Sequence, residues 1–247
     1  MSKFAHDTIV PYAGSALGKK EQVAEMFDRI AFRYDFLNRF LSAGTDVSWR
    51  KKAIEVLAGL QPKSILDVAT GTGDMAIMMA NRLPQSKIIG IDISEGMLVK
   101  GREKLLKAGL ERQISLQSGD SETINYPPAS FDAVSVAFGV RNFEHLEKGL
   151  KEIFRVLKPG GKLVILEFSK PKTLGIKQLY NLYMGIIAPQ VGKIFCKNKD
   201  AYQYLNDSVQ RFPEGNEFVD ILQSVGFTNT TCKHLSFGIC SIYAGIK

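Results

Sequence analysis

The sequence Ile65-Leu66-Asp67-Val68-Ala69-Thr70-Gly71-Thr72-Gly73-Asp74 joins a short apolar run to two closely spaced glycines. The apolar run predicts a buried strand over residues 64–69, and the pattern after it predicts a helix over 74–82. Glycine in the connecting turn lets the backbone approach a ligand that a β-carbon would obstruct. The stretch therefore predicts the first strand, turn and helix of an α/β nucleotide-binding fold.

Short apolar runs alternate with helical patterns after this turn, which is typical of βαβ units and a parallel sheet. Pro159-Gly160-Gly161 separates one such helix from the next strand, because proline stops a helix and glycine permits a turn. The chain ends in two strand-like runs joined by the turn-prone Ser236-Phe237-Gly238. The expected strands are 87–91, 114–118, 131–137, 162–167, 228–235 and 240–246, and the expected helices are 96–107, 146–157 and 213–225.

Apolar residues at helical spacing before the sheet predict helix over residues 19–42 and again over 47–57. Another apolar segment, residues 170–206, interrupts the later alternation and carries lysines between its apolar residues. We expect this insertion to form a lid over an apolar substrate. The chain is thus expected to be one domain, 1–247, with a flexible leader (1–18), N-terminal helices (19–61) and the insertion.

The net charge of +7 in 247 residues allows an ordinary solvated surface or contact with an anionic membrane. It argues little for nucleic acid, because the sequence has no arginine-rich tract. Cys196, Cys232 and Cys240 lack the spacing of a metal site and are expected to be free thiols, so no metal is predicted. No run approaches the roughly 20 apolar residues of a membrane span, and residues 1–15 lack the apolar core of a signal peptide. A cytoplasmic location is therefore predicted.

Acidic residues follow the expected strands at positions suited to a nucleoside. Asp92 can accept hydrogen bonds from both ribose hydroxyls. Residues 71–76 also match the dinucleotide fingerprint, so the glycine turn and Asp92 together suit either a nicotinamide nucleotide or S-adenosylmethionine. Asp67 favours the second, because a carboxylate attracts a methionine ammonium and repels a pyrophosphate. Asp120 can accept from an adenine amino group, although a helix cap is a rival interpretation. The predicted cofactor-binding residues are Asp67, Ala69, Gly71, Thr72, Gly73, Asp92, Ile93, Asp120, Ser121 and Ala137.

Three longer motifs are similar to those of a known enzyme family. The stretch 155–169 ends in Glu167-Phe168-Ser169, the stretch 34–42 continues to Trp49, and Phe138-Gly139-Val140-Arg141-Asn142 follows an expected strand. With these motifs the chain resembles the ubiquinone/menaquinone biosynthesis C-methyltransferases from about Glu21 to its end. It departs at Leu37, usually methionine, and at Asp46, usually histidine, which argues against essential histidine chemistry there.

The resemblance implies a class I methyltransferase fold, Rossmann-like, with a seven-stranded sheet that ends in an antiparallel hairpin. It implies methyl transfer from S-adenosylmethionine to a ring carbon of a prenylated quinol, with a menaquinone-type ring favoured and a benzoquinol left open. Arg141 is expected to stabilise the phenolate and Asn142 to orient the quinol oxygen. Tyr34 is expected to relay a proton or line the ring, and Asp35 to pair with Arg141. The rival interpretations are that Arg141 pairs with Glu144, Asn142 caps a helix and Tyr34 is core.

Other functions stay open at this point. A nicotinamide-dependent dehydrogenase, a lipid- or RNA-binding module without activity, and a methyltransferase for another small molecule such as a sterol or phenol all suit the same fold. The expected partners are a prenylated quinol and no nucleic acid. Peripheral contact with the inner face of the membrane and a homodimer are further expectations.

Overall fold

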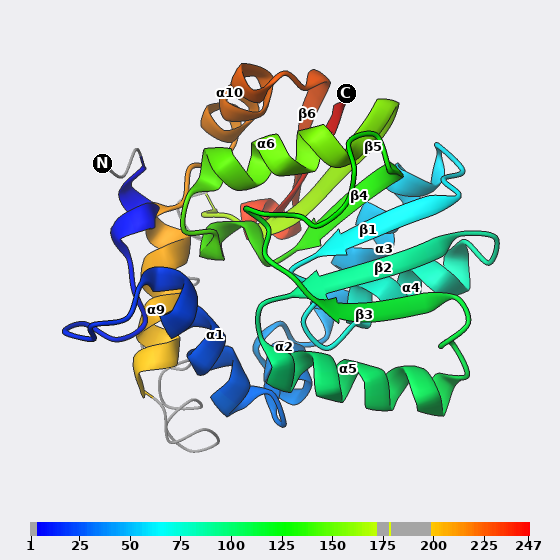
Figure 1. Ribbon diagram of the computed structural model, residues 1–247. Helices are drawn as coiled ribbons and strands as arrows, with labels where there is room; N and C mark the ends of the chain where they lie inside the picture. Colours follow the sequence, from blue (N-terminus) through cyan, green and yellow to red (C-terminus); the bar gives the residue numbers. More distant parts are fainter. Residues whose placement is uncertain (1–3, 172–177, 179–198) are drawn as a thin grey trace.

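The computed structural model describes residues 4–171, 178 and 199–247. Its centre is a seven-stranded sheet in the order β3-β2-β1-β4-β5-β7-β6 (Figure 1). The first five strands run parallel, and β7 pairs antiparallel with both β5 and β6. This confirms the expected antiparallel end of the sheet. The strands are β1 (Ser64–Val68), β2 (Lys87–Asp92), β3 (Ile114–Ser118), β4 (Phe131–Ala137), β5 (Leu157–Phe168), β6 (Thr228–Leu235) and β7 (Cys240–Ile246).

Helices cover both faces of the sheet, which explains why its central strands are mostly apolar. Ile65 of β1 packs into the cluster on one face and Leu66 into the cluster on the other, and neither is exposed. The first face is covered by α3 (Thr45–Ala58), α4 (Asp74–Arg82) and α5 (Glu95–Ala108), and the second by α6 (Leu146–Val156) and α10 (Asn216–Val225).

A third group of helices lies at the edge of the sheet where β1–β4 end (Figure 1). Val23 and Met26 of one helix pack with Tyr204 of another, so segments from the two ends of the chain meet there. In open α/β sheets this is the edge where ligands bind. The group comprises η1 (Ala5–Thr8), α1 (Lys19–Ile30), α2 (Tyr34–Leu41), η2 (Val140–Asn142) and α9 (Lys199–Arg211).

The structure corrects two expectations for the N-terminal region. Residues 19–42 form two helices rather than one, with a break at 31–33 where Phe32 is 64% exposed. The leader, expected to be flexible, contains η1, and its His6 is fully buried. His6 packs edge-on against Phe212, and its carbonyl accepts a hydrogen bond from Lys19 Nζ at 2.9 Å. These contacts hold the leader on the helices at the edge of the sheet.

Strand β5 also differs from expectation, because it begins at Leu157 and runs through the proline and both glycines. Gly160 has a φ of +77°, and the register between β4 and β5 shifts in this stretch. Most of the expected lid, residues 170–206, lies outside the described residues, and its last part belongs to α9. None of the helices in the described ranges has the length and apolar character that crossing a membrane requires.

Candidate functional site

Two strained turns sit side by side where β1 and β4 end. Ala69 and Phe138 both have left-handed backbone conformations, with φ of 54° and 58°. A β-carbon at Gly139 would lie 2.5 Å from that of Ala69, so glycine is required where the turns touch. Strain of this kind in residues other than glycine concentrates at functional sites, where the surrounding structure enforces it. Here it shapes the floor of a pocket.

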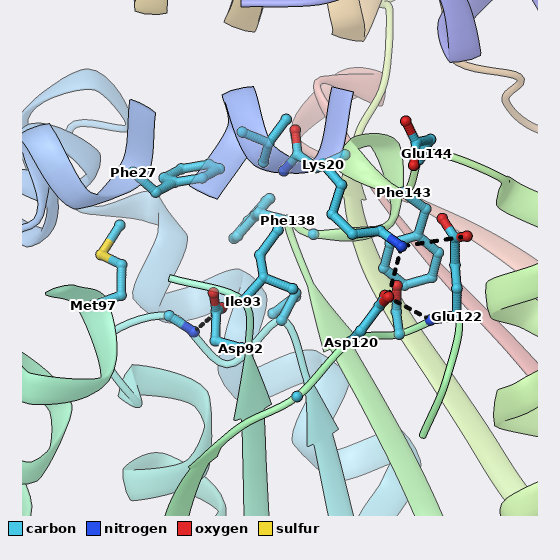
Figure 2. A pocket seen from close by; sticks show the side chains of 18 of the residues that line it. Lys20, Phe27, Asp92, Ile93, Met97, Asp120, Glu122, Phe138, Phe143 and Glu144 are labelled. Carbon is cyan, nitrogen blue, oxygen red and sulfur yellow. Dashed lines mark hydrogen bonds and ion pairs between the residues drawn. The ribbon is translucent and has the colours of Figure 1, made fainter. Parts of the chain in front are cut away.

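The pocket lies between these turns and α1 and holds about 640 Å³, open solvent at its mouth included. Figure 2 shows α1 crossing above it, with Phe27 and Lys20 pointing toward the loops below. Seven of the predicted cofactor residues line it: Ala69, Gly71, Asp92, Ile93, Asp120, Ser121 and Ala137. Tyr34 and Asn142, two of the predicted catalytic residues, line it as well.

Asp92 ends β2 and joins it to the glycine turn. Its Oδ2 accepts a hydrogen bond from the Gly71 amide at 2.8 Å, and its Oδ1 accepts one from the Ser94 amide at 2.9 Å (Figure 2). Burial raises the pKa of Asp92 to about 6, and these amide hydrogen bonds only partly oppose the shift. A β-carbon at Gly71 would meet no atom within 4 Å, so this turn faces open space beside the carboxylate.

Asp120 follows β3 and is held by a lysine that sequence reasoning missed. Lys20 Nζ of α1 donates to Asp120 Oδ2 at 2.6 Å and lies 3.6 Å from Glu122 Oε2 (Figure 2). Burial disfavours the charge on Lys20, but the hydrogen bond and negative charge of Asp120 outweigh it and raise the pKa of the lysine. A signal was present, because lysines at positions 19 and 20 stand in the first turn of a helix, where the helix dipole disfavours cations.

Asn142 and Tyr34 face the pocket from different elements. Asn142 ends η2, and its Oδ1 accepts a hydrogen bond from the hydroxyl of Tyr204 at 3.1 Å. Tyr34 begins α2, and its ring packs edge-on against Phe27 of α1. Burial raises the pKa of Tyr34, so its hydroxyl is protonated at neutral pH and can donate. The pocket thus has neutral hydrogen-bonding groups in addition to the carboxylates of Asp92 and Asp120.

Arg141 lies behind this wall rather than on it. Its Nη1 donates to Glu167 Oε1 at 2.8 Å and to the Phe138 carbonyl at 2.5 Å. Both side chains of the ion pair are buried. The expected pairing with Asp35 is wrong, and so is the rival pairing with Glu144, because β5 places Glu167 next to η2. Arg141 therefore holds the strained turn at Phe138 from below.

Asp35 belongs to a different cluster, which fastens α2 to the glycine turn. Its Oδ1 accepts a hydrogen bond from Thr72 at 2.5 Å, and its Oδ2 lies 2.7 Å from Lys104 Nζ. Lys104 also donates to Thr72 at 2.9 Å and to Asp74 at 2.6 Å. Thr72 and Asp35 therefore belong to a hydrogen-bonded cluster that connects α2, α4 and α5, and they do not line the pocket.

Asp67 is likewise set back from the pocket. Its two oxygens accept hydrogen bonds from Thr70 at 2.6 Å and Ser135 at 2.5 Å. Burial raises the pKa of Asp67 to about 6, although both hydrogen bonds lower it. Gly73 has a φ of +78° and begins α4, also away from the pocket wall. The interaction of Asp67 with a methionine ammonium stays a prediction.

Known proteins share the sequence pattern of this chain along nearly its whole length. The model of the ubiE/COQ5 methyltransferase family matches residues 16–247. The demethylmenaquinone methyltransferase of Bacteroides fragilis is 46% identical over 245 residues, which are 99% of each chain. The ubiquinone/menaquinone biosynthesis C-methyltransferase UbiE of Geobacter sulfurreducens is 44% identical over 230 residues, covering 93% of this chain and 90% of its own.

Solved structures share the fold at lower identity. A SAM-dependent methyltransferase from Thermotoga maritima has a TM-score of 0.60 and 22% identity, covering 90% of this chain and 99% of its own. The phosphoethanolamine N-methyltransferase 2 of Haemonchus contortus, solved with S-adenosyl-L-methionine, has a TM-score of 0.58 and 16% identity, covering 80% of this chain and 52% of its own. These likenesses confirm the expected class I methyltransferase architecture.

Proposed function

The chain belongs to the ubiE/COQ5 methyltransferase family, and we propose that this S-adenosylmethionine-dependent enzyme methylates a ring carbon of a prenylated quinol, with demethylmenaquinol as its substrate. The choice of a naphthoquinol ring is supported by the relative from Bacteroides fragilis, a demethylmenaquinone methyltransferase that matches the whole length of this chain. The observation that carries the proposal is a pocket lined both by the carboxylates of Asp92 and Asp120 and by two neutral hydrogen-bonding groups, Asn142 and Tyr34.

Asp92 and Asp120 suit the binding of S-adenosylmethionine. Asp92 would accept hydrogen bonds from the ribose hydroxyls, and Asp120 from the adenine amino group. Gly71 leaves open space where a side chain would block the approach. The cofactor supplies a methyl group made electrophilic by its bond to a positively charged sulfur. Neither carboxylate needs to act on that sulfur, because their part is to orient the molecule.

The neutral groups of the pocket suit a ring that must become nucleophilic. Ionisation of a quinol hydroxyl pushes electron density onto the ring, so donors near that oxygen favour the reactive form. We assign this role to Asn142, with Tyr34 as a second donor or an element of the ring wall. The methyl group would pass to the ring carbon, and S-adenosylhomocysteine would leave with the electron pair of the broken carbon–sulfur bond, while Asn142 and Tyr34 stabilise the ring oxygen. The ring carbon then loses its proton to solvent, which restores the aromatic system.

We assign Arg141 an indirect part in the same chemistry. Its charge is balanced by Glu167, and one of its hydrogen bonds ends on the Phe138 carbonyl in the turn that lines the pocket. Its main effect is then to hold Phe138 and Asn142 at their positions. This keeps Arg141 as a residue for catalysis and moves it from the ring oxygen to the supporting turn.

The direct test combines the purified protein, S-adenosylmethionine and chemically reduced demethylmenaquinol with a short prenyl tail, followed by mass spectrometry. We expect a product heavier by one methylene unit together with one equivalent of S-adenosylhomocysteine. A prenylated benzoquinol and a sterol serve as competing substrates. Turnover of either of these with no turnover of the naphthoquinol defeats the assignment, and binding of NADH with no binding of S-adenosylmethionine favours a dehydrogenase.

We also propose peripheral contact with the cytoplasmic face of the inner membrane, because a prenylated substrate resides in the bilayer. The net charge of +7 supports it, as do Phe32, Phe36 and Phe40, which are 64%, 53% and 48% exposed around α2. Co-flotation with vesicles that contain anionic lipid, and much less with neutral vesicles, is the expected result. The homodimer stays a prediction that sedimentation velocity tests.

A further inference from the structure

Asn142 is connected to a buried tyrosine on a different part of the chain. The Tyr204 hydroxyl donates a hydrogen bond to Asn142 Oδ1 at 3.1 Å. Tyr204 lies on α9 and is 3% exposed, whereas Asn142 is half-buried and lines the pocket. Tyr204 itself does not line the pocket. The pair therefore links the pocket wall to the helix behind it.

The direction of this hydrogen bond determines which end of the amide faces the pocket. With Oδ1 engaged by Tyr204, the donor group of Asn142 is its Nδ2, and within the described parts of the chain Nδ2 has no hydrogen-bond partner. A side-chain amide without a fixed partner can turn over and exchange its oxygen and nitrogen. An amide oxygen turned toward an ionised ring oxygen would repel it, whereas an NH₂ group stabilises it.

Tyr204 is well suited to hold the amide in one orientation. Its ring packs with Val23 and Met26 of α1, so the hydroxyl has a fixed position. Burial raises the pKa of Tyr204 above its usual value, and Glu167 adds to the increase while Arg141 opposes it. The hydroxyl thus keeps its proton throughout the neutral pH range, and Asn142 Oδ1 is the atom to which it donates.

We propose that Tyr204 is a positioning residue for methyl transfer, because its hydrogen bond to Asn142 Oδ1 turns the NH₂ group toward the negative charge of the quinol oxygen. This inference rests on the proposed function and adds a residue outside the pocket to it. Tyr204 makes no contact with the substrate and acts through Asn142. Its position on α9 also makes the orientation of Asn142 depend on how that helix is seated.

The test uses the full-length enzyme, S-adenosylmethionine and reduced demethylmenaquinol with a short prenyl tail. Tyr204→Phe removes one hydroxyl, and we expect kcat to fall about tenfold, the equivalent of ~1.4 kcal/mol in the barrier. The acidic limb of the kcat profile should move to higher pH, because the bound ring hydroxyl loses stabilisation of its ionised form. The Kd for S-adenosylmethionine should stay within about twofold, because Asp92 and Asp120 are untouched.

Tyr243→Phe is the matched control, since it also removes a buried hydroxyl, one that accepts from the Gly215 amide at 2.9 Å away from the pocket. It should leave kcat and its pH profile unchanged. Asn142→Ala then provides a double-mutant cycle. If Tyr204 acts through Asn142, the double variant is no slower than Asn142→Ala alone.

The outcomes separate this inference from the proposed function. If the wild-type enzyme methylates the quinol and Tyr204→Phe has the same kcat and pH profile, the positioning role is overturned and the proposed function stands. A further tenfold loss in the Asn142→Ala background also overturns it, because Tyr204 would then act by another route. Wild-type enzyme that methylates no prenylated quinol overturns the proposed function, and the positioning role with it.

Discussion

Lys20 on α1 and Asp120 after β3 are 100 positions apart in sequence, and their side chains meet at 2.6 Å across the pocket. The contact joins the helix above the pocket to the loop below it (Figure 2). Asp28 fastens the other end of α1, because its Oδ1 accepts hydrogen bonds from Ser94 at 2.6 Å and from the Gly96 amide at 2.8 Å. The helix is thus attached on both sides of the pocket.

Lys20→Met should speed both the binding and the release of S-adenosylhomocysteine, because the side of α1 above Asp120 would be detached. We expect each rate constant to rise about fivefold, as loss of a partly exposed ion pair amounts to about 1 kcal/mol. Stopped-flow fluorescence measures both rates. Lys148→Met is the control, because Lys148 approaches Glu122 at 3.7 Å but does not line the pocket. Equal effects of the two variants would count against the attachment.

Cofactor affinity should depend on the ionisation of Asp92. A carboxylate accepts hydrogen bonds from hydroxyls best when ionised, and the pKa of Asp92 is raised to about 6 by burial. The affinity should therefore be constant above about pH 7 and fall as pH drops through 6, approaching tenfold per pH unit. Isothermal titration calorimetry checks this. Asp92→Asn should bind weakly and without that dependence.

The control for this titration is Asp67→Asn, because the pKa of Asp67 is also raised to about 6. Asp67 is engaged by Thr70 and Ser135 away from the pocket, so its variant should retain a fall in affinity at acidic pH. The midpoint should move to lower pH, because the charges of Asp67 and Asp92 raise each other's pKa. If Asp67→Asn loses the pH dependence and Asp92→Asn keeps it, the titrating group is Asp67 in β1 and not Asp92 at the end of β2.

Breaking the buried pair between Arg141 and Glu167 should destabilise the fold strongly. Glu167→Ala leaves a buried guanidinium without its counter-charge, and we expect the free energy of unfolding to fall by about 3–5 kcal/mol. Replacing both residues by methionine should recover much of this stability while kcat stays low. Urea denaturation measures the first effect and methyl transfer the second.

Arg82→Ala is the comparison for that pair, because Arg82 binds Glu55 on the surface with both side chains more than half exposed. Because solvent surrounds both groups, its cost should be much smaller than that of Glu167→Ala. If Glu167→Ala is no more costly than Arg82→Ala, the buried pair does not support the turn at Phe138.

Lys104→Met should loosen α2. The lysine lies between Asp35 of α2 and Asp74 of α4, at 2.7 Å and 2.6 Å. Its loss removes the ion pair of Asp35, whereas Asp74 keeps Arg39, whose Nη2 donates to it at 3.0 Å. Amide hydrogen exchange in α2 should become about tenfold faster, which corresponds to ~1.4 kcal/mol of local opening. Lys100 lies on the same helix, and among the described residues it pairs only with Glu103 on the surface. Lys100→Met should therefore leave the hydrogen exchange of α2 unchanged. Similar exchange rates in both variants would show that Lys104 does not hold α2 in place.

Sequence patterns predicted the elements whose ends are marked by local chemistry. Helix α4 and strands β3, β4, β6 and β7 have the expected bounds, because turn residues or a change of period delimit them. Asp92 and Asp120 were predicted to lie together, since parallel strands end at one edge of the sheet. The break of α1 from α2 was missed, because residues 31–33 contain neither glycine nor proline.

The contacts that sequence reasoning could not supply join residues far apart in the chain. The partner of Arg141 is Glu167, 26 positions away on β5, and that of Asn142 is Tyr204, 62 positions away on α9. Such pairs depend on how helices pack at the end of the sheet. The spacing of residues within one element does not predict these pairs. Asp67, Gly71 and Asp92, in contrast, belong to short sequence patterns that predict their positions.

The pocket is assembled from segments that alternate along the chain. Lys20 and Tyr34 precede β1, Asp92 and Asp120 follow β2 and β3, and Asn142 follows β4. The groups assigned to the methyl donor and those assigned to the ring are therefore interleaved in the sequence. No single fragment carries a complete binding surface, so retention of the cofactor reports on the folding of the whole domain.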